Sequence, residues 1–346
     1  MSSITLFGAG SWGTALSAHL AKAGRDVTLW ARRPEAADRM RHTHHNSKYR
    51  RNLLLPDSVQ VTSDVATAAA ASDLWAMAVP APHLRSVAER IQDHAREDVT
   101  LVSLAKGIEK GTLQTMTQVL DEVVEAVPTE QIGVLYGPSH SEEVGKGQPT
   151  TLVAAATRES VVEEIREMFM TDSLCVYGST DVMGVEIGGS AKNVLAIAAG
   201  ISDGVGYGDN VKAALMTRGL AEMRRLGVAM GGRPETFSGL TGIGDLIVTC
   251  TSQHSRNRYM GEQVGQGLSL KEVRSEMGMV AEGTHTAKAV YALAQKYDLE
   301  MPIATTVYTL LFEDGHPQRV LRELVTQRSK RERWLPEIDQ QPAVAG

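Results

Sequence analysis

The sequence predicts an α/β domain followed by an all-helical domain. Three observations predict this division: short apolar strands alternate with helices as far as Gly178, a glycine-rich turn joins the first strand to the first helix, and only helical patterns follow Gly178. The expected domains are residues 1–180 and 181–336, with a flexible tail over 337–346. The 346 residues are enough for two domains that each have a core.

Composition narrows the class of protein. Hydrophobic residues make up 42% and charged residues 22%, and the formal net charge of −6 gives no electrostatic case for a nucleic-acid partner. Cys175 and Cys250 stand in apolar contexts that do not suggest a disulfide framework. The first residues do not read as a secretory leader, and no run reaches the ~18 uninterrupted apolar residues of a membrane helix. We therefore expect a cytoplasmic enzyme or binding protein that is not inserted in a membrane.

The first elements carry a dinucleotide-binding motif. The apolar strand Ser3–Phe7 is followed at once by GAGSWG (residues 8–13), then by an apolar helix over Thr14–Ala23 and a second strand over Asp26–Trp30. A GxGxxG pattern is weak evidence alone, but a strand before it and a helix and strand after it are the context that a dinucleotide site requires.

Each glycine of this motif has an expected role. Gly8 permits the tight turn, Gly10 lets the backbone approach a pyrophosphate, and Gly13 allows the helix to pack closely on the strand. The N-terminus of the helix then offers N–H groups and a positive dipole end to the pyrophosphate.

The residues after the second strand bear on the choice of dinucleotide. An acid commonly binds the ribose 2′-hydroxyl there, whereas this chain has Arg32 and Arg33. Guanidinium groups favour a 2′-phosphate, which indicates NADP(H) over NAD(H). The alternative is that both arginines belong to a solvated turn before Pro34.

A basic, histidine-rich segment spans Arg41–Arg51. His42, His44 and His45 allow a metal site to be considered, but no cysteine or acid converges with them in sequence, so we expect no metal. We interpret the segment as a polar loop that covers the cofactor side of the cleft.

Three further strands should end at one edge of the sheet, where open α/β sheets bind ligands. They are expected at Leu74–Val79, Thr100–Leu104 and Gln131–Leu135. Their ends deliver the turn Pro80–His83, the side chain of Lys106, and the turn Gly137–Ser139. The sheet should be completed by strands at Thr151–Ala155 and Leu174–Tyr177, separated by a helix at Glu159–Met170.

The stretch Glu186–Ser202 predicts a buried helix that carries one cation, Lys192. A buried ammonium without a partner costs several kcal/mol and usually responds with a lowered pKa, which suggests a functional charge. Gly188, Gly189 and Ala191 make this helix thin, so that another backbone or a ligand can approach it. The alternative is a lysine that extends to the surface.

The second half otherwise consists of helices and glycine-rich turns. The segment 238–246 places Asp245 at a helix entry, Ser269 and Glu272 form a capping box, and Arg328–Arg333 is expected to be a solvated helix end. Helices are expected at Asp181–Ser202, Val211–Val228, Arg256–Gly265, Leu270–Met277, Thr284–Tyr297, Thr305–Phe312 and Arg319–Thr326.

One of these helix starts has the chemistry of a phosphate site. Ser255 is a good N-cap, and Arg256 adds a guanidinium beside the first amides of the helix. An ordinary capped surface helix with basic residues in water is the alternative.

Several motifs together resemble the bacterial NAD(P)-dependent sn-glycerol-3-phosphate dehydrogenase family. They are GAGSWG, AKGIE, YGPS, GGSAKNVLAIAAGISDGVGYGDNVKAALMTRGLAEM, GIGDLIVTCTSQHSRNR and AEGTHTAK, and the similarity covers roughly Ile4 to Thr326. The resemblance implies a Rossmann domain, a helical domain like that of 6-phosphogluconate dehydrogenase, and a homodimer. It also implies the reversible reduction of dihydroxyacetone phosphate to sn-glycerol 3-phosphate for phospholipid synthesis.

The resemblance also implies residue roles. Lys192 matches the family's proton acceptor. The implied substrate-binding residues are Lys106, Gly137, Ser139, Lys192, Asp245, Ser255, Arg256 and Asn257. The implied cofactor-binding residues are Gly8, Gly10, Ser11, Trp12, Gly13, Arg32, Arg33, Tyr49, Lys106, Ser141, Arg256, Val280 and Glu282. Tyr136, Ala81, His140 and Ser141 differ from the residues common in the family.

The residues themselves fit this chemistry. A lysine with a lowered pKa can exchange a proton with a ketone oxygen near neutral pH, Lys106 would depress that pKa further, and Asp245 could orient Lys192. A non-catalytic dinucleotide sensor would need no such cluster, and a dehydrogenase for a carboxylated hydroxy acid is the alternative among enzymes.

Overall fold

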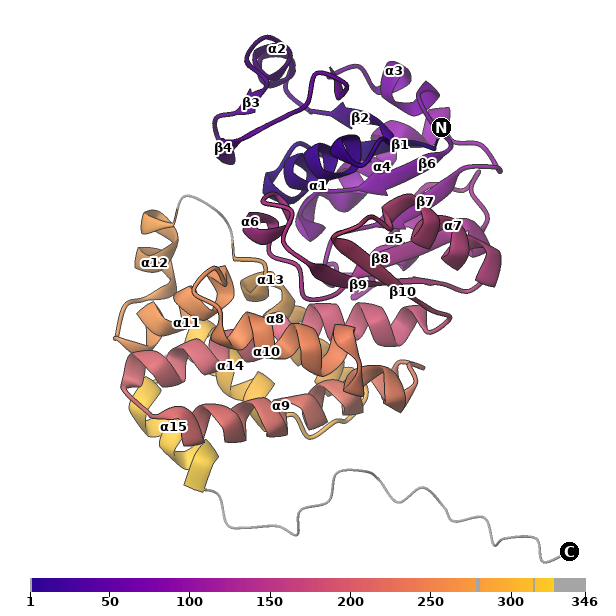
Figure 1. The fold of residues 1–346 in the computed structure, drawn as a ribbon. Helices are drawn as coiled ribbons and strands as arrows, with labels where there is room; N and C mark the ends of the chain where they lie inside the picture. Colours follow the sequence, from indigo (N-terminus) through magenta and orange to yellow (C-terminus); the bar gives the residue numbers. More distant parts are fainter. Residues whose placement is uncertain (1, 278–280, 314, 327–346) are drawn as a thin grey trace, which may run out of the picture.

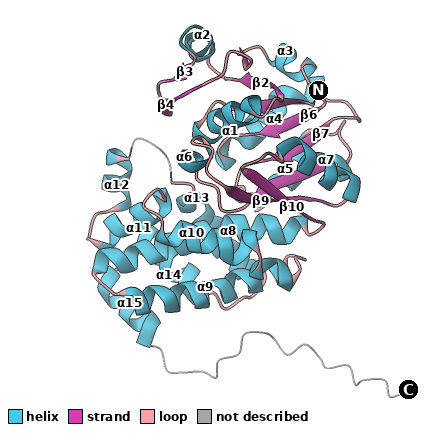
Figure 2. Cartoon of the chain, in the orientation of Figure 1, coloured by secondary structure: helices cyan, strands magenta, loops and turns pink. Residues whose placement is uncertain are grey.

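The computed structural model describes residues 2–277, 281–313 and 315–326. A twisted sheet with helices on both faces forms one body, and a group of helices packed against its lower edge forms the other (Figure 1). Figure 2 shows that strands are confined to the first body. The α/β part ends with β10 (Leu174–Ser179) and the helical part begins with α8 (Val182–Val205). An α/β part followed by a helical part is the fold class that the sequence predicted.

The main sheet has eight strands in the order β10-β9-β8-β7-β6-β1-β2-β5. Neighbouring strands are parallel except for β8 and β9, which are antiparallel. The chain leaves β1 for β2 on one side and returns to β6 on the other, so the topological switch point lies between β1 and β6. The strands are β1 (Ser3–Phe7), β2 (Asp26–Trp30), β5 (Gln60–Thr62), β6 (Leu74–Met77), β7 (Thr100–Ser103), β8 (Ile132–Tyr136), β9 (Thr150–Ala156) and β10.

Helices cover both faces of this sheet and bury a separate apolar cluster against each. The strands are therefore almost continuously apolar, as expected for strands buried on both faces. The helices are α1 (Ser11–Lys22), α2 (Pro34–Thr43), α3 (Val65–Ala70), α4 (Leu84–Ile91), α5 (Met116–Val123), α6 (Ser141–Val144) and α7 (Glu159–Phe169), with short 3₁₀ turns at Ala81–His83, Gln92–His94 and Thr129–Gln131.

The prediction of a polar loop over Arg41–Arg51 was wrong. Its first residues end α2, and the rest form a small hairpin of β3 (His45–Asn46) and β4 (Arg50–Leu54). The physical reason is Asn46, whose buried amide donates to the backbone oxygen of Ala9 at 2.9 Å and to the Thr14 hydroxyl at 2.8 Å. These bonds fix the hairpin to the glycine turn and the start of α1.

The helical domain is built around α8, whose residues 184–202 are all buried. Observed helix ends lie within a few residues of the predicted ones, and the Ser269–Glu272 capping box is present. The other helices are α9 (Asp209–Ala229), α10 (Asp245–Thr251), α11 (Arg256–Gly265), α12 (Leu270–Glu276), α13 (Gly283–Lys296), α14 (Pro302–Phe312) and α15 (Pro317–Thr326), with a 3₁₀ segment η4 (Pro234–Ser238) and a π-helical turn η5 (Leu240–Gly244).

The thin face of α8 is used as predicted. A Cβ at Gly188 would lie 2.5 Å from the Thr241 backbone oxygen in η5, and one at Gly189 would lie 2.6 Å from the ring of Tyr136 in β8. The helical domain and the sheet therefore approach α8 where it has no side chains.

A second set of glycines brings α8 and α11 into backbone contact. A Cβ at Gly200 would lie 1.9 Å from the Arg258 backbone oxygen, and one at Gly261 would lie 2.1 Å from that of Ile197. Gly204 and Gly265 face the opposing backbone in the same way. The two helices cross at a distance that any side chain at these positions would prevent.

By length and composition α8 could cross a membrane, because its 18-residue window reaches a mean hydropathy of 1.2. Within the described chain, however, 89% of that window is buried. Its apolar character is therefore explained by its place at the centre of the helical domain.

Replacing Gly200 by alanine tests the α8–α11 crossing. We expect Gly200→Ala to lower the free energy of unfolding by about 2–3 kcal/mol or more, because the added methyl group overlaps a backbone oxygen that cannot rotate away. Gly208→Ala is the matched control, since its added Cβ meets no atom within 4 Å. Urea denaturation of both variants measures the difference, and equal stabilities would show that the helices can separate without cost.

Candidate active site

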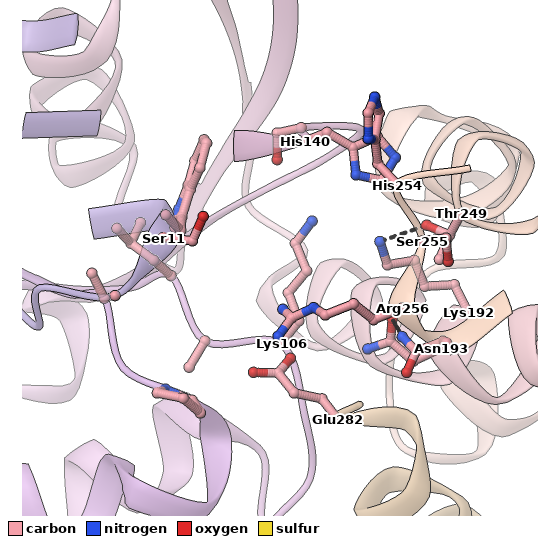
Figure 3. Close-up of a pocket in the computed structure, with 18 of the residues that line it drawn as sticks. Ser11, Lys106, His140, Lys192, Asn193, Thr249, His254, Ser255, Arg256 and Glu282 are labelled. Carbon is pink, nitrogen blue, oxygen red and sulfur yellow. Dashed lines mark hydrogen bonds between the residues drawn. The ribbon is translucent and has the colours of Figure 1, made fainter. Parts of the chain in front are cut away.

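A pocket of about 230 Å³ lies between the two bodies at the carboxyl ends of β1, β6, β7 and β8 (Figure 3). The three predicted strand ends do meet here, because Pro80, Lys106 and Ser139 all line it. The helical domain supplies the opposite wall from α8, α10, α11 and the segment before α13. The lining residues are Gly10, Ser11, Trp12, Ala78, Val79, Pro80, Leu104, Ala105, Lys106, Ser139, His140, Lys192, Asn193, Thr249, His254, Ser255, Arg256, Asn257 and Glu282.

The glycine turn at one end of the pocket has the form that a dinucleotide requires. Gly8 has φ +128°, and a Cβ there would lie 2.4 Å from the Ala78 backbone oxygen. A Cβ at Gly13 would lie 2.0 Å from the Gly8 oxygen, whereas one at Gly10 would meet nothing within 4 Å. Two glycines thus serve close packing and the third leaves open space at the N-terminus of α1, so the turn fits a bound pyrophosphate.

At the other end, one carboxylate holds two lysines. Lys106 donates to Asp245 Oδ2 at 2.8 Å and to the backbone oxygen of Gly137 at 2.7 Å. Lys192 donates to Asp245 Oδ1 and to the Thr249 hydroxyl, the latter at 2.8 Å. Thr249 in turn donates to the backbone oxygen of Asp245, one turn earlier in α10, at 2.6 Å.

Each ammonium keeps one N–H for a ligand. An ammonium has three N–H donors, and the described residues accept two of them from Lys106 and two from Lys192. Both side chains line the pocket, with Asp245 behind them and only 1% exposed. The cluster can therefore present two N–H donors to one small polar group.

Burial and neighbouring charges set the protonation of this cluster. Burial lowers the pKa of Lys192 to about 8; Asp245 opposes this shift and Lys106 adds to it. Burial alone would raise the pKa of Asp245, but the charges of Lys106 and Lys192 outweigh it and hold that pKa below its ordinary value. Lys192 can thus gain or lose a proton near neutral pH beside a carboxylate that stays ionised.

The first turn of α11 forms the wall next to Lys192. Ser255 caps the helix by accepting the Arg258 N–H at 3.2 Å, and the first residues of the helix, Arg256 and Asn257, line the pocket. The side-chain amide of Asn257 donates to Asn193 at 2.9 Å and accepts the N–H of Gly283 at 3.0 Å. It therefore ties α11 to α8 and α13.

Glu282 lines the pocket across from the lysines and near Arg256 (Figure 3). Burial raises the pKa of this carboxyl group, and the charges of Arg256, Lys106 and Lys192 oppose the rise. The carboxylate balances part of the positive charge that three cations bring to the site.

The remaining predicted residues lie either next to this pocket or outside its wall. Gly137 and Asp245 lie behind Lys106, and Ser141 exchanges a hydrogen bond of 2.8 Å with Ser11 in the glycine turn. The exposed side chains of Arg32 and Arg33 follow β2, and Tyr49 lies in the β3–β4 turn, so these three are outside the pocket wall. Val280 lies outside the described residues, as do Arg328–Arg333 and the tail 337–346.

Four polar residues of the pocket wall were not among the predicted site residues: His140, Asn193, Thr249 and His254. A helical spacing of four residues after Asp245 could have indicated Thr249, because both side chains then share one face of a helix. Asn193 and His254 adjoin the predicted residues Lys192 and Ser255, but their roles depend on contacts between helices that the sequence does not specify.

The histidines considered for a metal do not converge. His42 bonds to the backbone oxygen of Asp38 and His44 faces Asp57, at 2.7 Å and 3.4 Å respectively. Among the described residues, no group of three or more His, Cys, Asp or Glu side chains could hold a metal ion.

A dinucleotide turn that faces a buried lysine across an interdomain pocket defines a nicotinamide-dependent oxidoreductase. Comparisons with known proteins agree. Models of the N- and C-terminal domains of NAD-dependent glycerol-3-phosphate dehydrogenase match residues 3–162 and 181–322. The chain therefore belongs to the NAD-dependent glycerol-3-phosphate dehydrogenase family.

Individual relatives support the same family. A glycerol-3-phosphate dehydrogenase (NAD(P)+) of Salinibacter ruber is 62% identical over 99% of this chain and 100% of its own length. One from Chlorobium phaeobacteroides is 50% identical over 95% and 98%. The crystal structure of glycerol-3-phosphate dehydrogenase from Coxiella burnetii superposes with a TM-score of 0.89 at 36% identity, over 94% of this chain and 99% of that one.

More distant structures share the fold alone. A ketopantoate reductase from Ralstonia eutropha has a TM-score of 0.57 at 17% identity, over 93% of this chain and 99% of that one. Such similarity shows a common two-domain architecture and says nothing of this chain's substrate.

Proposed function

We propose that this chain reduces dihydroxyacetone phosphate to sn-glycerol 3-phosphate, reversibly, with NADP(H) or NAD(H), in support of phospholipid synthesis. The observation that carries the proposal is the buried Lys192–Asp245–Lys106 cluster beside the first turn of α11. It combines a proton donor for a ketone with a site for a phosphate group in one pocket.

In the proposed mechanism, the bound nicotinamide supplies the hydride that reduces the ketone carbon. Lys192 directs its remaining N–H at the ketone oxygen and gives that oxygen a proton as negative charge develops on it. Lys106 adds a second N–H donor and stabilises the same charge. Asp245 keeps both ammonium groups in place, and in the reverse direction neutral Lys192 accepts the proton of the alcohol.

The proposed substrate contacts follow the pocket wall. The first amides of α11 and the Arg256 guanidinium would bind the phosphate, because a helix N-terminus with an arginine favours a dianion. Ser139, held by its bond to the Gly137 oxygen at 3.0 Å, would contact the three-carbon backbone. Ser255 acts by capping the helix.

The proposed cofactor contacts lie at the Rossmann end. Gly10, Ser11 and Trp12 would hold the pyrophosphate, with Gly8 and Gly13 shaping the turn. Arg32, Arg33 and Tyr49 would reach the 2′-phosphate from outside the pocket wall, and Ser141, Lys106, Arg256 and Glu282 would adjoin the nicotinamide end. We further propose a cytoplasmic homodimer, on the resemblance to the family.

The pH dependence of the reaction tests the role of Lys192. Reduction requires the ammonium form, which is populated below the Lys192 pKa of about 8, so kcat/KM for reduction should fall as the pH rises through about 8. Oxidation of glycerol 3-phosphate requires the neutral amine and should rise over the same range. Lys192→Ala should lose roughly 10²–10⁴-fold in kcat, and its rates should show neither of these changes near pH 8. A variant that kept both changes would assign the proton to another group, with Lys106 the first to examine.

Cofactor choice tests the role of Arg32. Its exposed guanidinium follows β2, where it could pair with a 2′-phosphate. We expect the wild-type chain to use NADPH at least as well as NADH and Arg32→Asp to weaken NADPH selectively. NADH is the internal control, and an unchanged ratio of kcat/KM for the two cofactors would exclude the assignment.

Phosphate recognition tests the role of Arg256. Charge-assisted hydrogen bonds are worth about 1.5–3 kcal/mol, so Arg256→Ala should lower kcat/KM for dihydroxyacetone phosphate by at least ~10-fold. Unphosphorylated dihydroxyacetone has no phosphate to bind there and should be little affected by the substitution. The ratio of kcat/KM for dihydroxyacetone phosphate to that for dihydroxyacetone should therefore be much lower in Arg256→Ala than in the wild-type chain. Equal losses on both would mean that the arginine serves the cofactor or the fold.

A further inference from the structure

One buried polar atom of the pocket has no partner in the described chain. It is Nε2 of His140, which lines the pocket from the turn between β8 and α6 and is shielded from solvent. Buried polar groups in native proteins are nearly always hydrogen-bonded, so an unpaired one in a binding pocket indicates a contact made to a ligand. Neither the proton-donating cluster nor the glycine turn uses this atom.

The neighbours of His140 indicate which part of a ligand it would meet. Its ring packs edge to face against that of His254, with centroids 5.8 Å apart and planes at 63° (Figure 3). His254 comes directly before Ser255, the cap of α11, so the histidine pair adjoins the first turn of that helix. The edge-to-face contact is a favoured arrangement of aromatic rings and restricts how the His140 ring can turn.

His140 differs from the other donors in charge. Burial lowers the pKa of its imidazole, and the positive charge of Lys192 lowers it further, whereas Glu142 and Glu143 oppose these effects. A neutral imidazole has one N–H donor and one acceptor nitrogen, so it can bind an anion without adding another cation to the site. Lys106, Lys192 and Arg256 already bring three.

We propose that His140 is a substrate-binding residue whose Nε2–H donates a hydrogen bond to the phosphate group of the three-carbon substrate, and that His254 is a positioning residue for its ring. The inference rests on the proposed phosphate site at α11. His140 approaches that site from the Rossmann domain, whereas Arg256 belongs to the helical domain, so the phosphate would be held from both domains at once.

Steady-state kinetics with phosphorylated and unphosphorylated ketone test the proposal. In His140→Leu, the ratio of kcat/KM for dihydroxyacetone phosphate to that for dihydroxyacetone should fall roughly 10- to 150-fold, the effect of one hydrogen bond to a charged acceptor. Inorganic phosphate, used as a competitive inhibitor, should bind more weakly by a similar factor. His140→Gln, which can place an N–H near the position of Nε2, should restore most of both. His94→Leu, a substitution of a half-buried histidine in a 3₁₀ turn that does not line the pocket, is the control.

Substitutions of the second histidine separate its proposed role from a direct contact. His254→Phe keeps the ring contact and should preserve the ratio, whereas His254→Ala should lower it. An unchanged ratio in His140→Leu, or a raised KM for NADPH instead, would overturn the inference. If Arg256→Ala still lowers the ratio of kcat/KM for the two ketones in that case, only the role of His140 fails. If neither substitution lowers the ratio, the proposed phosphate site itself is wrong.

Discussion

The sharing of one carboxylate by two lysines is the interaction on which the site depends. Asp245 is buried, and a buried carboxylate is stable only when it is paired and hydrogen-bonded. Its two oxygens go to two different ammonium groups, one from each structural body. Asp245 and its two lysines therefore join the Rossmann and helical domains, and the net charge of one positive unit suits an anionic substrate.

The helix α8 makes this arrangement possible because so much of it lacks side chains. Gly188 and Gly189 admit η5 and Tyr136, while Gly200 and Gly204 admit α11. Two charged residues of α8 are buried with defined partners. Lys192 meets Asp245 and Thr249, and Glu186 accepts the backbone N–H of Thr117 at 2.9 Å, which joins α8 to the start of α5.

Much of this could be predicted from the sequence, because local patterns specify it. The glycine turn, the strand ends and the helix caps depend on neighbouring residues, and Lys192 stands out as a cation in an apolar helix. The hairpin after α2 could not be predicted, since its polar sequence is held by the tertiary bonds of Asn46. Nor could the sequence show that Thr249 accepts a hydrogen bond from Lys192 or that the rings of His140 and His254 are in contact. The antiparallel direction of β9 and β10 relative to the other strands was also not predictable.

The side chain of Asn257 has a consequence for the size of the substrate. By bonding to Asn193 and to the backbone of Gly283, it fixes the first turn of α11 to the same stretch of α8 that carries Lys192. The separation between the first turn of α11 and the Lys192 nitrogen is then a fixed property of the packed helices. In the proposed binding mode, a ketone one carbon further from its phosphate would not place its oxygen at Lys192, so this separation would select the chain length of the substrate.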